Sequence, residues 1–247
     1  MKVKPAIEKL EIARQLQAKI NTMQGLGKLS NEPPSAGLAP FNAAFPGKIF
    51  PTGAIHEFIS YEAANAASTS GFITAIISKL IKNGGLCLWV ANGRKNFPPG
   101  LKYFGLEPDR IVFINASRTK DILWIIEEAL KCEALTAVIG EVKEINFTDS
   151  RRLQLAVENS RVTGFIHRYC PRAENAVACT TRWKITSLPS LPEDNLPGVG
   201  HSAWDVRLVK VRNGRPRSWQ VSWQDKNFAP IAVSHDTILQ LNQRNTA

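Results

Sequence analysis

The clearest chemical pattern in the chain lies between Gly53 and Asn92. A short apolar run, Ile55 to Ile59, precedes small and polar residues from Tyr61 to Gly71, and apolar residues at helical spacing follow from Phe72. We therefore expect a strand, a loop and a helix, which is the setting in which a small-residue loop binds phosphate. The candidate phosphate loop consists of Ser68, Thr69, Ser70 and Gly71.

The side chains that such a loop needs are missing. Where phosphate loops have Gly-Lys-Ser/Thr, this chain has Gly71-Phe72-Ile73. The lysine supplies charge to the phosphates and the hydroxyl holds Mg²⁺, and neither Phe72 nor Ile73 can replace them. A helix N-terminus could still attract an anion weakly through its free N–H groups. We interpret the segment as a degenerate phosphate loop that closes a βαβ unit, and we expect neither a cofactor nor catalysis.

Two further groups of residues could bind a cation. Glu141 stands near the end of the apolar run Ala134 to Val142, where it is either a cation carboxylate or a solvated cap. His167, Cys170 and Cys179 lie close together but lack the paired spacing of a metal site. We expect free thiols in a reducing cytosol and no bound metal.

The net charge of +10 is unevenly distributed. Residues 151–247 carry 14 Lys and Arg against 7 Asp and Glu. Such an excess permits contact with nucleic acid or with an acidic partner, although many basic faces are merely solvated. No aromatic residue lies between Pro171 and Arg182, so base stacking is not expected there. The candidate contacts to DNA or a partner are Arg151, Arg152, Arg168, Arg172, Arg182, Arg212, Arg215 and Arg217.

Strands and helices are predicted to alternate along the middle of the chain. This order predicts an α/β fold with a mostly parallel sheet flanked by helices, joined by right-handed crossovers. Further along, residues 203–208 and 219–223 flank Asn213-Gly214-Arg215-Pro216, which predicts a C-terminal β-hairpin. The expected strands cover residues 55–59, 86–90, 110–114, 134–142, 162–167 and 181–185, and the expected helices cover 72–81, 122–130 and 150–160.

The ends of the chain differ from this core. Residues 1–27 are expected to form a helix with the apolar stripe Ile7, Leu10, Leu16, Ile20 and Met23. The predicted division is an N-terminal helix at 1–27, a linker at 28–52, the core at 53–186, a linker at 187–202, the hairpin at 203–227 and a tail at 228–247. We expect a truncated chain from Thr52 to Phe228 to fold.

The first linker carries Phe41, Phe45 and Phe50, which are too apolar for a free segment, so we expect it to pack on a surface. No signal peptide is recognisable after the basic residues Lys2 and Lys4, and the longest apolar run is too short to span a bilayer. These features predict a cytoplasmic location without contact to a membrane.

The order of elements resembles the RecA recombinase core and, more narrowly, the ImuA family, over residues 53–223. The match also includes Arg151-Arg152-Leu153-Gln154-Leu155-Ala156 and Thr181-Arg182-Trp183. The other segments that carry it are Gly53-Ala54-Ile55-His56-Glu57, Ser68 to Phe72, Leu88-Trp89-Val90, Pro99 to Leu106, Leu123 to Leu130, Val138 to Glu141, and Gly214 to Trp219.

The resemblance implies a non-catalytic, RecA-like accessory protein of the SOS response to DNA damage, which supports error-prone translesion synthesis. Its implied partners are a polymerase-like Y-family subunit and an error-prone replicative-type polymerase, together with single-stranded DNA or RecA. The N-terminal helix is expected either to mediate self-association, as in RecA-like proteins, or to pack back onto its own core, and the linker is long enough for both. Two alternatives are a cell-division inhibitor resembling SulA and a DNA-dependent ATPase with an unusual phosphate site.

Overall fold

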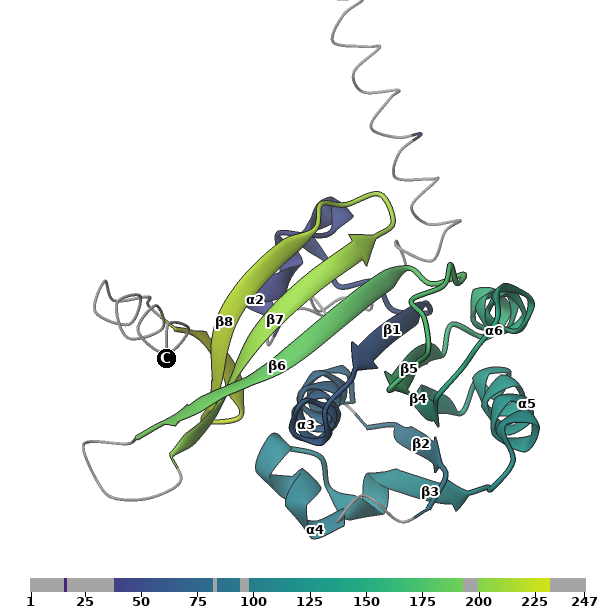
Figure 1. The fold of residues 1–247 in the computed structure, drawn as a ribbon, viewed down its shortest axis with the longest axis horizontal. Coiled ribbons are helices and arrows are strands. Elements are labelled where there is room, and N and C mark those ends of the chain that lie inside the picture. The colour runs from purple at the N-terminus through teal and green to yellow at the C-terminus, as the bar shows by residue number, and fades with distance from the viewer. Residues whose placement is uncertain (1–15, 17–37, 82–83, 94–97, 193–199, 232–247) are drawn as a thin grey trace, which may run out of the picture.

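The computed structural model describes residues 16, 38–81, 84–93, 98–192 and 200–231. They form a sheet of nine strands in the order β3-β2-β4-β5-β1-β6-β7-β8-β9 (Figure 1). The strands are β1 (Ile55–Ser60), β2 (Leu86–Ala91), β3 (Ile111–Asn115), β4 (Leu135–Val142), β5 (Thr163–Tyr169), β6 (Thr181–Leu191), β7 (His201–Val211), β8 (Arg217–Gln224) and β9 (Asn227–Pro230). Pairs from β3 to β6 are parallel and pairs from β6 to β9 are antiparallel.

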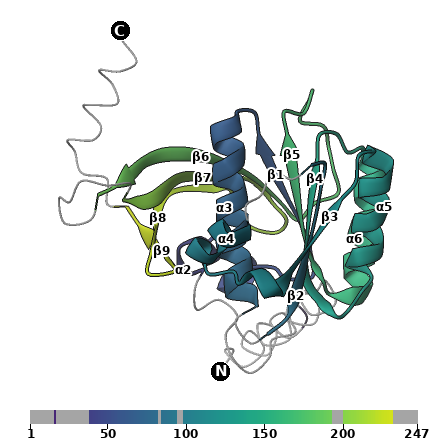
Figure 2. The same cartoon turned by 90° about the horizontal axis from the view of Figure 1, so that it is seen from below.

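The helices lie on both faces of the sheet (Figure 2). They are α2 (Ala39–Asn42), α3 (Ala63–Leu80), α4 (Pro98–Leu101), α5 (Thr119–Leu130) and α6 (Phe147–Ser160), with short 3₁₀ turns η1 (Pro46–Lys48), η2 (Lys102–Phe104) and η3 (Pro108–Arg110). Helix α3 covers one face, while α5 and α6 cover the other. This is a RecA-like α/β fold, and it confirms the predicted fold class and the C-terminal hairpin.

Each face of the sheet has its own apolar core. On the α3 face, a cluster of buried residues contains eleven aromatic side chains, among them Phe58, Phe72, Trp183 and Trp204. On the α5–α6 face, the described buried cluster is made of aliphatic residues, alanine and cysteine, without an aromatic member. Packing on both faces explains why the parallel strands read as continuous apolar runs.

Helix α3 begins at Ala63, so the prediction of a loop from Tyr61 to Gly71 is wrong. Alanine has the highest helix propensity, and this stretch contains several alanines. The first turn closes when the Ala66 N–H donates to the Glu62 carbonyl at 2.9 Å. The pattern that looked like a loop is therefore the exposed first half of a helix of 18 residues.

The described part of the first linker belongs to the core. Phe41, Phe45 and Phe50 are buried, and Phe41 packs edge-on against Phe72 and Trp183. The Arg215 N–H donates to the Ala44 carbonyl at 3.2 Å, which joins this segment to the β7–β8 hairpin. The expected packing on a surface is confirmed, but the boundary of the folded unit at residue 53 is wrong.

The second linker and the tail are also shorter than predicted. Strand β6 continues to Leu191, with a register shift between Leu188 and Leu191 that accommodates Pro189. Strand β9 pairs with β8 and places Phe228 in the core. The predicted N-terminal helix, apart from Leu16, and the tail beyond Ile231 lie outside the described residues. Among the helices that the structure describes, none combines the length and apolar character needed to cross a bilayer.

Candidate functional site at the carboxyl ends of the strands

The predicted phosphate loop is part of helix α3. The Thr69 hydroxyl forms a hydrogen bond within the helix, in which Oγ1 donates to the Asn65 carbonyl at 2.7 Å. Phe72 points into the aromatic core, with ring centroids 5.3 Å from Phe228 and 5.6 Å from Trp204. Ser68 to Gly71 thus lack the loop conformation whose N–H groups would surround a phosphate.

A hollow of about 490 Å³ lies beside α3 at the carboxyl ends of the strands. Its volume is within the range of ligand sites, and open α/β sheets bind ligands at this end of their strands. Gly71 shapes one wall, because a Cβ atom at this position would lie 2.7 Å from the Phe104 ring. The lining residues are Ala63, Ala66, Ala67, Ser70, Gly71, Gly100, Leu101, Phe104, Glu141, His167 and Tyr169.

The polar end of the hollow is formed by β4 and β5. Glu141 is the register partner of His167, so the two side chains lie on the same face of neighbouring strands. The Trp89 Nε1–H donates to Glu141 Oε1 at 2.8 Å, and His167 Nε2 lies 2.5 Å from the Ser60 hydroxyl. Among the described residues that line this hollow, Glu141 is the only Asp, Glu, Lys or Arg. Within those residues, no group of three His, Cys, Asp or Glu could hold a metal ion.

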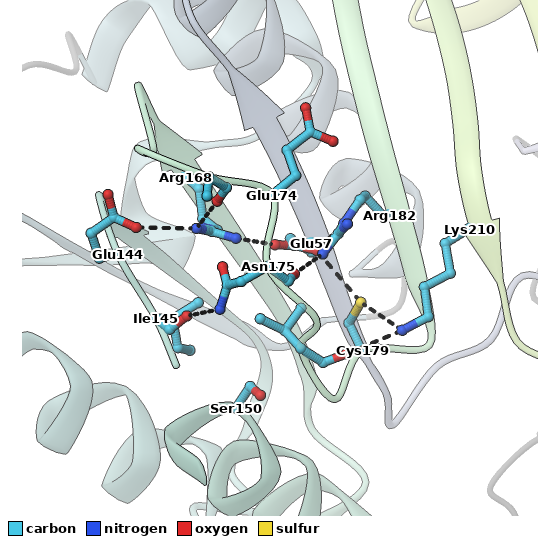
Figure 3. A network of polar contacts seen from close by, with 12 residues as sticks. Glu57, Glu144, Ile145, Ser150, Arg168, Glu174, Asn175, Cys179, Arg182 and Lys210 are labelled. Atoms are coloured by element: carbon cyan, nitrogen blue, oxygen red, sulfur yellow. Dashed lines mark hydrogen bonds and ion pairs between the residues drawn. The ribbon is translucent and has the colours of Figure 1, made fainter. Parts of the chain in front are cut away.

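A second polar site lies on the α5–α6 face, where Glu57 is buried inside strand β1 (Figure 3). Arg168 Nη1 donates to Glu57 Oε1 at 2.9 Å, and Arg182 Nε donates to Glu57 Oε2 at 2.5 Å. The Cys179 thiol donates to the same carboxylate at 3.6 Å. Burial raises the pKa of this thiol to about 11, so it remains protonated at neutral pH.

The arginines of this site hold the loop between β5 and β6. Arg168 Nη2 donates to the Ala173 carbonyl at 2.9 Å, and Arg182 Nη2 donates to the Asn175 carbonyl at 2.7 Å. At the outer end, Glu144 accepts from the Arg172 N–H, and this hydrogen bond lowers the pKa of the Glu144 carboxyl. The loop that was expected to contact DNA is therefore anchored by a buried carboxylate.

The predicted contact residues fall into three groups. Arg168 and Arg182 have side chains only 0% and 12% exposed, so their assignment as DNA or partner contacts is wrong. Arg151 and Arg152 lie on α6, where Arg152 is paired with Glu127 at 2.5 Å. The other candidates, Arg172 in the loop and Arg212, Arg215 and Arg217 at the β7–β8 turn, are exposed.

Sequence reasoning missed Glu57, although a carboxylate inside an apolar strand was the available signal. It also missed a surface between α5 and α6 that exposes apolar residues among charged ones. Two hollows of about 410 and 400 Å³ lie there, and both are lined by Glu127 and Arg152. We call this the α5–α6 surface, and the exposed apolar side chains that line its hollows are Trp124 (61% exposed) and Leu155 (46%).

Comparison with known proteins decides the family. No model of a protein family matches the chain. Two curated proteins from Caulobacter vibrioides, strains NA1000 / CB15N and ATCC 19089 / CIP 103742 / CB 15, are each named Protein ImuA. Both are 31% identical to this chain over 208 residues, which is 79% of this chain and 85% of each relative. The chain belongs to the ImuA family. The family resemblance found in the sequence is thus confirmed, and ImuA membership is favoured over a SulA-like protein.

Proposed function

We propose that this ImuA-family protein is a non-catalytic accessory factor of damage-induced mutagenesis in the cytoplasm. In this proposal it binds a polymerase-like Y-family subunit and supports error-prone translesion synthesis together with a replicative-type polymerase. The role comes from the family resemblance. The α5–α6 surface is the observation that carries the binding part of the proposal, because it supplies a place for a partner.

The absence of catalysis is supported by the geometry of α3. A nucleotide-hydrolysing site needs a lysine and a metal-binding hydroxyl at a loop, whereas Phe72 and Ile73 are buried within a helix. We therefore expect no ATP turnover, with or without single-stranded DNA. DNA-dependent turnover that disappears in Glu141→Gln would contradict the proposal and favour an unusual ATPase.

The proposed partner surface exposes apolar side chains among charged ones. Trp124 protrudes from α5, and Phe147 is exposed at the start of α6. Exposed apolar patches of this kind mark binding sites, and tryptophan and arginine are enriched among the residues that dominate affinity. Glu127 and Arg152 form an ion pair and line both hollows. They provide polar contacts beside the apolar ones.

The test is co-purification with the polymerase-like subunit from the same genome, followed by titration of the purified pair. We expect Trp124→Ala to weaken binding by at least about tenfold, as for a central interface tryptophan. Phe113→Ala is the matched control, because Phe113 is an exposed aromatic residue on β3. Equal affinity of Trp124→Ala and the unaltered protein would exclude this surface, and the absence of any complex would contradict the proposed function.

DNA binding through the β7–β8 turn is a second candidate activity. Arg212, Arg215 and Arg217 are exposed, and in the described part of the chain no ion pair joins them to an acidic residue. If they contact phosphates, affinity for single-stranded DNA should fall steeply with salt, and the triple alanine variant should flatten that slope. An unchanged slope would assign the turn to another partner, such as RecA, or to solvent.

A further inference from the structure

A group of exposed cationic side chains lies at the amino ends of β1, β5 and β6. It joins the turn between β7 and β8 to two segments that the sequence did not connect with it, the end of α6 and the turn η1. We call this group the amino-end surface, and its residues are Lys48, Arg161, Arg212, Arg215 and Arg217. In the part of the chain that the structure describes, none of these side chains forms an ion pair or a hydrogen bond, so all five charges face solvent.

Backbone contacts place the β7–β8 turn beside the end of α6. The Arg212 N–H donates to the Thr180 carbonyl at 2.8 Å, and the Thr180 N–H donates to the Ile55 carbonyl at 2.8 Å. Gly53, just before β1, lies against the last residue of this row, because a Cβ atom on Gly53 would lie 3.2 Å from Arg161 Cα. The two arginines are therefore carried by segments that meet at the start of β1.

The same turn is fixed to the segment that carries Lys48. The Arg215 N–H donates to the Ala44 carbonyl at 3.2 Å, and Gly214 has no side chain where it approaches this carbonyl. The Lys48 N–H in turn donates to the Phe45 carbonyl at 3.1 Å. Figure 1 shows α2 and the β7–β8 turn at the same end of the molecule. The backbone that carries the charges is thus positioned before a ligand binds, which lowers the entropic cost of binding.

Negative charge is absent from the sequence around this surface. Residues 38–56, 159–173 and 206–224 contain neither Asp nor Glu. Cations that are not neutralised within the protein attract a polyanion, and the attraction also speeds the encounter. Four of the five groups are arginines, whose planar guanidinium matches the oxygens of a phosphate in a bidentate contact.

The character of the surface favours duplex DNA over other polyanions. Among the described residues 44–53, 159–163 and 211–218, no large hydrophobic side chain is exposed. Single strands are commonly held by stacking of bases on aromatic side chains, and protein interfaces are more than half apolar in area. Duplex DNA presents one phosphate charge about every 1.7 Å along its axis, so charges alone are enough to bind it.

We propose that the amino-end surface binds the phosphate backbone of double-stranded DNA without reading its sequence. The inference rests on the second candidate activity described above, the contact of the β7–β8 turn with DNA. It adds Lys48 and Arg161 to that contact and identifies the duplex as the ligand. None of the five residues lines the hollows of the α5–α6 surface, so the two surfaces can be altered separately.

The test is a titration of the full chain, followed by fluorescence anisotropy, with three labelled probes. These are a duplex of about 20 base pairs, one of its single strands, and a polyglutamate peptide of about the same charge. We expect the duplex to bind most tightly, with a plot of log K against log[salt] whose slope is about −4 to −5, as for five phosphate contacts.

A double variant tests the part of the surface outside the turn. Lys48→Ala combined with Arg161→Ala should reduce the magnitude of the slope by about two and weaken duplex binding at low salt. Lys102→Ala combined with Arg110→Ala is the matched control, since it removes the same charge from exposed side chains that lie outside the surface, and it should leave the slope unchanged. Circular dichroism checks that each variant is folded.

The outcomes separate this inference from the proposed function. An unchanged slope in the Lys48 and Arg161 double variant, absence of duplex binding, or tighter binding of the single strand or of polyglutamate would each overturn the inference. Absence of a complex with the polymerase-like subunit, while the duplex still binds through these residues, would contradict the proposed function and leave the inference standing.

Discussion

The two faces of the sheet use aromatic residues in opposite ways. On the α3 face, eleven aromatic side chains are buried together and hold α2, α3 and the C-terminal strands on one core. On the α5–α6 face, the described core is aliphatic, while Trp124 and Phe147 are exposed on its outer helices. A buried aromatic side chain contributes about 1.5–3 kcal/mol, and an exposed one contributes little to stability. The α3 face thus holds the aromatic core of the fold, whereas Trp124 lies on the surface that we propose for partner binding.

The largest expected effect comes from removing the segment before β1. A chain from Thr52 to Phe228 lacks Leu38, Phe41, Phe45 and Phe50, which are buried on the α3 face. Each loss costs about 2–5 kcal/mol, so the sum of about 8–20 kcal/mol is as large as the roughly 5–15 kcal/mol that stabilises a typical domain. The expectation from the sequence that this chain folds is therefore reversed, and we expect it to be unfolded by near-ultraviolet circular dichroism.

A chain covering residues 38–231 is the control, since it keeps this segment and all nine strands. We expect it to unfold cooperatively. Cooperative unfolding of the shorter chain as well would show that the aromatic core does not need its N-terminal segment, and the contrast between the faces would be weaker.

The next effect tests the buried charge of the α5–α6 face. Glu57→Gln removes the buried carboxylate shared by Arg168, which is fully buried, and Arg182, which is largely buried, and leaves Arg168 paired only with Glu144 at 3.3 Å. Removing one member of a buried ion pair costs about 3–5 kcal/mol. Urea unfolding should show this loss, whereas Glu158→Gln, at an exposed pair with a separation of 3.9 Å, should change stability by less than about 1 kcal/mol. Similar values for both variants would contradict a structural role of Glu57.

His56 precedes Glu57 in the chain and provides the corresponding test on the α3 face. Its Nε2–H donates to the Pro51 carbonyl at 2.8 Å, so Nδ1 accepts from the Thr181 hydroxyl at 2.7 Å. Burial lowers the pKa of His56 to about 4, whereas the unfolded chain takes up this proton near its ordinary pKa of 6.5. Stability should therefore be complete above pH 6.5 and should fall as the pH decreases towards 4, by a total of about 3 kcal/mol.

This loss is measured by urea unfolding between pH 7.5 and pH 5, a range above the ordinary pKa of the carboxyl groups. His56→Gln should be less stable at pH 7.5 but should show a smaller decrease on acidification. An identical decrease in both proteins would assign the pH dependence to other groups.

The smallest expected effect concerns the exposed aromatic side chain. Trp124→Ala should change the free energy of unfolding by about 0.5 kcal/mol or less, because 61% of the side chain is already in water. The matched variant on the other face, Phe72→Ala, should cost about 3–5 kcal/mol. A large loss in Trp124→Ala would mean that this residue supports the fold, and the reason to assign it to a partner would disappear.

The fold class could be predicted from the sequence because strand patterns alternate with helix patterns along the core. This order favours a mostly parallel sheet whatever the detailed packing is. The β7–β8 hairpin was predictable from Asn213 and Gly214, whose turn preference is local. The start of α3 was not, because Ser68 to Gly71 suit a loop and a helix almost equally, and only packing decides between them. Gly71 looked like a remnant of phosphate binding, whereas in the structure it leaves room for the Phe104 ring, which a Cβ atom at this position would meet.

The functional residues were harder to predict because their roles depend on distant partners. In the sequence, Arg168 and Arg182 look like part of a basic surface. In the structure both are bound to Glu57, which lies more than a hundred residues earlier, and they are largely buried. Trp124 belongs to an amphipathic helix in the sequence, and only the position of α6 shows that it stays exposed. Long-range pairing of this kind leaves no signal in local spacing.

The inward direction of Phe72 limits which side chains position 72 can accept. At this position a lysine would be surrounded by aromatic rings, and an ammonium without a partner there would cost several kcal/mol. A phosphate loop at Ser68 to Gly71 would also require the first half of α3 to leave its helical conformation. The aromatic packing of this face is therefore incompatible with a phosphate-binding lysine at position 72.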